Sequence, residues 1–182
     1  MENEEILPVV DECGNILDCA PRSRCHDGES KILHPVVHLH VVNPAGELLL
    51  QKRSMSKKIQ PGKWDTAVGG HISFGESVGD ALRREAQEEI GLDTTATGIT
   101  IEPVDQYLFE STVERELVCT HVCFLQGDFT PSTAEADQIE EFRFFTPQEL
   151  SALIAEGQAT PNFAEEYTSR IRPFIENHCE QQ

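Results

Sequence analysis

Two pairs of short apolar runs shape the first third of the chain. Residues 36–42 and 47–53 alternate or cluster apolar side chains on either side of a Pro/Gly-containing turn at 43–46, which is typical of a β-hairpin. An earlier pair surrounds the turn residues 12–15. The pattern therefore predicts two hairpins before residue 54.

The second half of the chain predicts strands followed by helices. Thr146 and Thr160 each precede a proline, as at a helix N-cap, and Glu149 completes a capping box. Pro173 is expected to kink or end the last helix. Three β-type runs come before these helices, near residues 97–110, 116–126 and 139–145. With one helix between the two sets of strands, this order predicts a mixed α/β sandwich rather than a regular βαβ repeat.

The central helix is the best-defined element. Residues 70–92 read GHISFGESVGDALRREAQEEIGL. Ser77 is a candidate N-cap, Asp80 places a carboxylate in the first turn, and Gly91 supplies a left-handed stop after Ile90. These signals predict a helix between Ser77 and Gly91.

Three glutamates share one face of this helix. Glu85, Glu88 and Glu89 are spaced i, i+3 and i+4, so their carboxylates lie side by side. Such repulsion is relieved when cations bind, and hard carboxylate oxygens select Mg²⁺ or Mn²⁺. Arg84, four residues before Glu88, is expected to hold that carboxylate. Taken alone, the spacing is also compatible with a solvated acidic face paired with arginines.

Length and charge narrow the class of protein. A chain of 182 residues can form one domain with a buried core. A net charge of −18 argues against a nucleic-acid partner. Without an apolar run of membrane length or a basic signal peptide, we expect a cytoplasmic protein with no membrane partner. The six cysteines lack C-x-x-C spacing, so reduced thiols are expected.

The full motif in residues 70–92 is Gly, five residues, Glu, seven residues, Arg-Glu-Ala, one residue, Glu-Glu, one residue, Gly-Leu. In every fixed position it resembles the Nudix hydrolases. The resemblance covers about residues 34–150 and implies a mixed sheet flanked by helices. We therefore expect a hairpin extension at 1–33, a Nudix domain at 34–150, and a C-terminal helical segment at 151–182 packed on the same domain.

The same resemblance implies metal-assisted attack of water on a small nucleoside diphosphate-type substrate, with Mg²⁺ or Mn²⁺ as cofactor. It assigns Glu85, Glu88, Glu89 and the backbone carbonyl of Gly69 to the metal, with Glu88 and Glu89 also expected to act in catalysis. The other motif residues are expected to have structural or supporting roles: Gly70, Glu76, Arg84 and Gly91. A homodimer is compatible with the sequence.

Outside the motif, residues 48–71 resemble the branch that includes isopentenyl diphosphate isomerase. Arg53 and Lys57 match the isomerase pair that binds diphosphate, and they belong to a local cluster of five basic residues within 52–63. The isomerase has a catalytic cysteine where this chain has Gly69, and a degenerate helix motif where this one is intact. Both differences favour hydrolysis. An isomerase-like enzyme and a non-catalytic ligand-sensing module are the alternatives.

Histidines near the motif raise the question of a second metal site. His38 and His71 match two positions of the isomerase's histidine-bound metal. His34 is nearby, and His40 shares a strand face with His38 but is expected to lie too far along it for a shared site. We therefore favour structural or substrate-contacting roles for these histidines. The same spacing argument favours a packed strand for another set: Cys119, His121 and Cys123.

The general base is expected in residues 134–145, where several Nudix hydrolases carry a glutamate. The usual position holds Gln138, whose amide cannot accept the proton. Asp137, Glu140 and Glu141 are the neighbouring candidates, and Glu141 matches a second frequent glutamate. A base within the helix motif, or an ordinary charged strand without a catalytic role, are the alternatives.

Overall fold

The computed structural model describes residues 4–133 and 138–180. Its elements, in chain order, are β1 Ile6–Val10, β2 Ile16–Pro21, α1 Arg22–Cys25, β3 Leu33–Val42, β4 Leu48–Arg53, β5 Trp64–Thr66, β6 Val68–His71, α2 Val78–Ile90, β7 Ile99–Glu110, β8 Arg115–Leu125, β9 Ile139–Phe145, α3 Pro147–Ala155, α4 Pro161–Glu166, a π-helical turn Tyr167–Ile171 and α5 Arg172–Glu180.

The main sheet is mixed and has seven strands. Five follow the order β5-β4-β3-β8-β7, while β6 pairs with β3 and β9 pairs with β4. The β3–β8 pair is parallel and the other pairs are antiparallel. Both predicted hairpins are present, since β1 pairs with β2 in a separate two-stranded sheet and β3 pairs with β4. The predicted mixed α/β architecture is confirmed.

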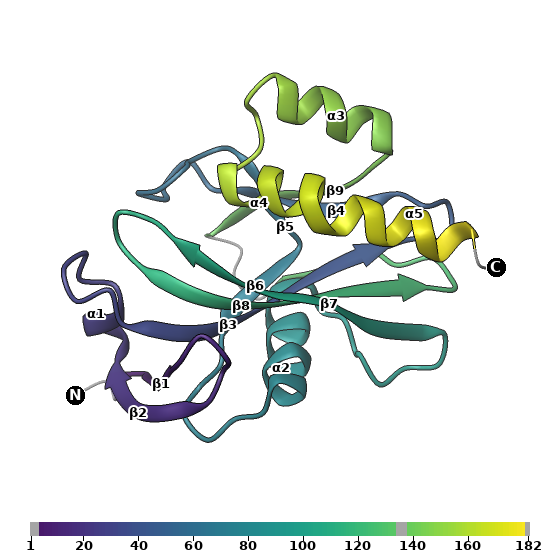
Figure 1. Cartoon of the computed structure of the whole chain (residues 1–182). Coiled ribbons are helices and arrows are strands. Elements are labelled where there is room, and N and C mark those ends of the chain that lie inside the picture. Colours follow the sequence, from purple (N-terminus) through teal and green to yellow (C-terminus); the bar gives the residue numbers. More distant parts are fainter. Residues whose placement is uncertain (1–3, 134–137, 181–182) are drawn as a thin grey trace.

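Helices cover both faces of the main sheet (Figure 1). On one face, Leu39 and Val41 of β3 pack with Ala86 and Ile90 of α2 in the first core. On the other face, β4, β8 and β9 pack against α3, α4 and the following turn in the second core, which includes Phe163. The helix α2 thus has its own side of the sheet, and the C-terminal helices have the other.

The predicted helix ends are confirmed where the structure tests them. Thr146 and Glu149 form the reciprocal capping box, and the Thr160 side chain caps α4. The last helix does not end at Pro173 but continues to Glu180. Because proline lacks an N–H, one turn must lose a hydrogen bond, and the wider π-helical turn lies directly before α5.

The two remaining sequence expectations concern cysteines and membrane spans. Cys13, Cys19, Cys25, Cys119 and Cys123, the cysteines with described side chains, are all free thiols. Within residues 4–133 and 138–180, no helix is both long and apolar enough to cross a membrane.

Candidate active site

The motif helix is held at both ends by its own sequence. The Ser77 hydroxyl accepts a hydrogen bond from the Asp80 backbone N–H, 3.2 Å away. At the other end Gly91 has φ 69° and closes the helix, a conformation that glycine adopts without a Cβ penalty. The predicted boundaries are therefore confirmed, and α2 presents a fixed face toward β6.

Glu85 packs directly on Gly70 of β6. A methyl group built on Gly70 would overlap the Glu85 carboxylate, so only glycine permits this approach. The Glu85 side chain is 12% exposed, and burial raises the pKa of its carboxyl above the ordinary value. The glycine of the motif therefore brings a partly desolvated carboxylate against the strand.

Arg84 links the acidic residues of the motif. Its guanidinium donates to Glu76 at 2.8 and 3.0 Å, to Glu85 at 2.6 Å, and to the His71 carbonyl at 3.0 Å. The expected ion pair with Glu88 is present but longer, at 3.5 Å. The hydrogen bonds from Arg84 lower the pKa of Glu76. Glu76 thus anchors Arg84, and Arg84 orients Glu85.

The other two helix carboxylates differ in their surroundings. Glu89 Oε2 accepts a hydrogen bond from the Gly69 N–H at 3.1 Å, and Gln51 lies 3.4 Å from the same oxygen. Glu88 has a side chain that is 53% exposed. Carboxylate oxygens on one helix face are ligands that Mg²⁺ and Mn²⁺ prefer. Of the three glutamates, Glu85 is the one that Arg84 contacts most closely, at 2.6 Å.

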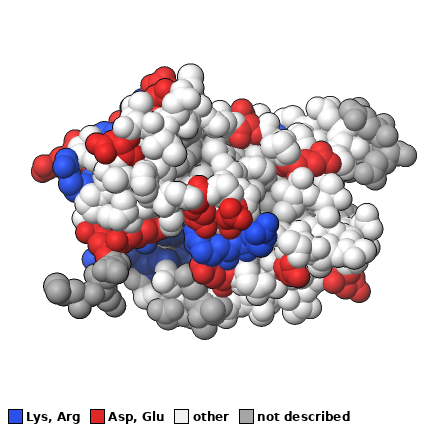
Figure 2. Space-filling view, turned by 90° about the horizontal axis from the view of Figure 1, so that it is seen from below, with Lys and Arg blue, Asp and Glu red and all other residues white. Residues whose placement is uncertain are grey.

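An open cleft of about 880 Å³ lies beside this helix. Glu89, Gly69 and Gly70 line it, and so do both predicted diphosphate ligands, Arg53 and Lys57. On the face seen from below, acidic side chains are scattered, and basic side chains gather at a few places with acidic ones beside them (Figure 2). In a chain of net charge −18, cations on a cleft wall give a local site for an anion.

Both predicted diphosphate-binding residues, Arg53 and Lys57, have protein partners. Arg53 NH1 lies 3.1 Å from Asp65 Oδ2, and its Nε and NH2 donate to the Ile59 carbonyl. Lys57 donates to the Gln138 side chain. A phosphate at this wall would therefore meet side chains that are already positioned.

The candidate general bases are dispersed. Gln138 lines the cleft. Glu140 lies at a break in the β4–β9 register, where it contacts the Met55 N–H and Lys52. Glu141 is exposed on β9, opposite Lys52, and is outside the residues that line the cleft. Asp137 lies outside the described residues. Of the candidate positions, the cleft is therefore lined by Gln138, whose amide cannot accept a proton.

A compact group of histidines lies next to Gly70, and two of them, His26 and His71, line the cleft. One ligand atom from each of His26, His34, His71 and Glu116 lies within 4.8 Å of all the others. The Nε2 atoms of His26 and His71 are 3.2 Å apart, and His34 Nε2 is buried without a hydrogen-bond partner. We call these four residues the histidine–glutamate cluster. Three imidazoles and a carboxylate are a donor set suited to a divalent transition metal.

Charge and burial set the protonation preferences of this cluster. Burial lowers the pKa of His71 to about 3, and neighbouring cationic groups add to the effect. Burial raises the pKa of Glu116 to about 7. Glu114 lies 3.2 Å from His26 and raises the pKa of that imidazole through a hydrogen bond. Neutral imidazoles beside a carboxylate are the form in which these residues bind a metal.

The sequence reasoning missed most of this cluster. It paired His38 with His71, but the structure puts these two histidines in different groups. His71 lies opposite Val36 in the antiparallel β3–β6 pair, and His34 lies opposite Glu116 in the parallel β3–β8 pair. His26 follows the short α1, which no periodicity predicted. One signal in the sequence could have pointed to the cluster: Glu114 and Glu116 are two residues apart at the start of a predicted strand, so their side chains share one face.

A second correction concerns His40. It was expected to lie too far along the strand to share a site with His38, yet both rings reach the same oxygen of Glu166, with nitrogens at 2.9 and 3.2 Å. Two imidazoles two residues apart can converge because Glu166 projects from α4 between them. By contrast, the set on β8 is a packed strand, where Cys123 is buried and His121 bonds the Cys119 carbonyl.

The protein thus has a mixed sheet between helices, and a glutamate-bearing helix beside a cleft lined by basic residues and histidines. Its histidine and glutamate clusters could bind a metal ion. The chain belongs to the Nudix family: residues 32–167 match the NUDIX domain. The Nudix fold implies a small diphosphate ligand.

Curated relatives fall into two groups. The chain is 35% identical over 158 residues to an isopentenyl-diphosphate Delta-isomerase of Corynebacterium efficiens, covering 82% of this chain and 81% of the relative. It is 30% identical to an uncharacterized Nudix hydrolase of Yersinia pestis, covering 81% and 76%. Among solved structures, DR0079 from Deinococcus radiodurans has a TM-score of 0.71 at 29% identity, covering 88% of this chain and 96% of that one.

Proposed function

We propose that this protein is a metal-dependent hydrolase that cleaves a diphosphate linkage in a small nucleoside diphosphate-type substrate by attack of water at phosphorus. The observation that carries the proposal is the intact motif helix against β6, with Glu85 on Gly70 and Glu89 on the Gly69 N–H. Two relatives named as uncharacterized Nudix hydrolases are compatible with this proposal.

Glu85, Glu88, Glu89 and the Gly69 carbonyl would hold Mg²⁺ or Mn²⁺. Such an ion supplies charge neutralisation of the phosphoryl oxygens and a lowered pKa of water. Arg84 keeps Glu85 oriented. Lys57 and Arg53, which line the same cleft, would bind the diphosphate.

The cleft offers no glutamate at the usual position of the general base, since Gln138 lies there. Among the described residues, Glu89 is the motif carboxylate that lines the cleft. We therefore place the proton acceptor within the motif, at Glu89 or at Glu88 beside it, rather than at the exposed Glu141.

The second candidate function is isomerisation of a prenyl diphosphate. The histidine–glutamate cluster favours it, because the resembling isomerase binds a metal through histidines, and several relatives carry that name. Gly69 argues against it, since the catalytic cysteine of that branch is missing. A Cβ at position 69 would lie 3.3 Å from the His38 ring, a tight contact that the ring would have to relieve by a small shift.

A single panel separates the two functions. Purified protein is incubated with Mg²⁺ or Mn²⁺ and nucleoside di- and triphosphates, dinucleoside polyphosphates, ADP-ribose, NADH, CoA or isopentenyl diphosphate. We expect metal-dependent phosphate or nucleotide release from one substrate class and no dimethylallyl diphosphate. Isomer formation would overturn the hydrolase proposal. Tight binding without turnover of any compound would instead favour the ligand-sensing alternative.

A further inference from the structure

We propose that His38, His40 and Glu166 form a buried zinc site that joins the main sheet to the C-terminal helices. His38 and His40 lie on β3, and Glu166 is the last residue of α4. This site is separate from the motif helix and from the histidine–glutamate cluster. It does not depend on which reaction the protein catalyses.

The three side chains already have the separations of metal ligands. Glu166 Oε2 lies 2.9 Å from His38 Nδ1 and 3.2 Å from His40 Nε2. Zinc bound tetrahedrally at about 2.0–2.1 Å from nitrogen and oxygen places neighbouring ligand atoms roughly 3.3 Å apart. Shifts of a few tenths of an ångström would therefore accommodate the ion between these atoms.

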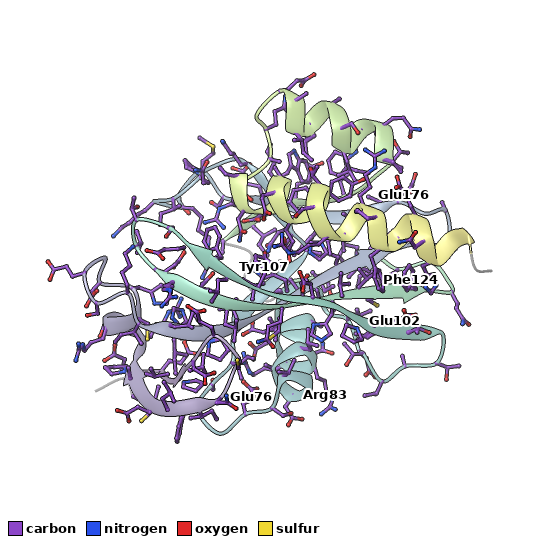
Figure 3. All side chains as sticks on the ribbon, viewed as in Figure 1. Glu76, Arg83, Glu102, Tyr107, Phe124 and Glu176 are labelled. Carbon is purple, nitrogen blue, oxygen red and sulfur yellow. The ribbon has the colours of Figure 1, made fainter. Side chains whose placement is uncertain are left out.

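Unpaired polar atoms gather at the same place. Nδ1 of His40 and Oε1 of Glu166 are buried without a hydrogen-bond partner, as is the hydroxyl of Tyr107. His40 and Glu166 are fully buried, where an unsatisfied polar atom is costly. Figure 3 places Tyr107 on β7, under the C-terminal helices.

The donor types select zinc over the ions expected at the motif helix. Two imidazoles and one carboxylate suit zinc, whereas Mg²⁺ prefers oxygen alone. Access is through the cleft, because His38 lines it and has a side chain that is 12% exposed. The other two ligands are closed off from solvent, which is typical of a structural site.

A zinc ion at this site would hold α4, which forms part of the cleft wall, against β3. Thr160, Pro161 and Asn162 at the start of α4 line the cleft, and Glu166 lies one turn further along the same helix. A zinc ion bound to Glu166 and β3 would fix that wall relative to β6. The alternative is a metal-free ion pair, in which a protonated His38 donates to Glu166.

The histidine–glutamate cluster would also bind zinc, so the experiment first disables it. In a His71→Asn background, zinc is measured by elemental mass spectrometry after dialysis against Mg²⁺ and a weak chelator. We expect about one zinc ion per chain. Adding Glu166→Gln should lower the content at least fivefold, whereas the matched control Glu165→Gln, on the exposed face of the same helix, should leave it unchanged. Equal zinc content in both double variants would overturn the proposal.

Anomalous diffraction at the zinc edge from crystals of the unsubstituted protein gives a second test that does not depend on the variants folding. A peak between His38, His40 and Glu166 is the expected result. A peak confined to His26, His34 and His71, or no peak, would replace the zinc site with the ion pair. Circular dichroism of each variant would show whether a loss of zinc reflects a loss of fold.

Discussion

The carboxylate of Glu85 lies directly over the Cα of Gly70, in the space where any other residue would carry its Cβ. Helix and strand approach this closely because the two residues are complementary: one lacks a side chain and the other fills the gap with a charged group. The contact brings the glutamate-bearing face of α2 onto β6. A substitution at Gly70 therefore tests the site without altering any charge.

Gly70→Ala should therefore damage the site by volume alone. The added methyl group must displace the Glu85 carboxylate from Arg84, and we expect a loss of about 1–3 kcal/mol in the free energy of unfolding, with a loss of activity. Urea denaturation measures the first and turnover the second. The control is Gly79→Ala in α2, where the nearest atom to a new Cβ is 4.0 Å away. Gly79→Ala should not destabilise the fold, because alanine favours a helix over glycine. Similar losses for both variants would show that the Glu85 contact is not the cause.

Glu89→Gln keeps the shape of the side chain and its hydrogen-bonding capacity but removes a charged ligand. We expect turnover to fall at least about a hundredfold with little change in unfolding temperature. Steady-state rates at saturating Mg²⁺ provide the measurement, with Glu156→Gln at the end of α3 as the matched control. Activity within about threefold of the unsubstituted protein would exclude Glu89 as a metal ligand.

Lys57→Ala should raise KM several-fold with a smaller change in kcat, since it removes binding made in both ground and transition states. The expected loss is about 1–2 kcal/mol of binding free energy. Arg53→Ala should do more, because a guanidinium engages two oxygens and because Arg53 also braces the Ile59 carbonyl. Lys58 is exposed and is the control. Equal KM changes at positions 53, 57 and 58, abolished by salt, would leave only long-range attraction.

The Glu76–Arg84 pair predicts a pH dependence of stability. The folded protein lowers the pKa of Glu76 below its ordinary value of 4.5, so the ionised form stabilises the fold above that pH. This contribution is lost as the pH falls through the lowered pKa. Glu76→Gln should cost about 1–3 kcal/mol at neutral pH. In urea titrations from pH 7 to pH 3, its difference from the unsubstituted protein should shrink below about pH 4.5. A constant difference would assign the effect to packing.

Local signals in the sequence were sufficient for the helix starts and for the motif. Ser77, Thr146 and Thr160 cap helices because each satisfies backbone N–H groups within three residues of itself. The i, i+3 and i+4 spacing of Glu85, Glu88 and Glu89 follows from helical geometry alone. Such features depend on near neighbours in the chain, and a sequence read in order contains them.

Contacts between distant segments were decided only by the tertiary structure. His34 meets Glu116 through the register of parallel strands 82 positions apart, and His26 reaches them from a short helix that carries no periodic pattern. Glu166 meets His38 because α4 packs on the opposite face of the sheet from α2. The sequence by itself determined the Nudix motif and the residues available for metals. Only folding decided which histidines share a site, because register and packing depend on the whole core rather than on local spacing.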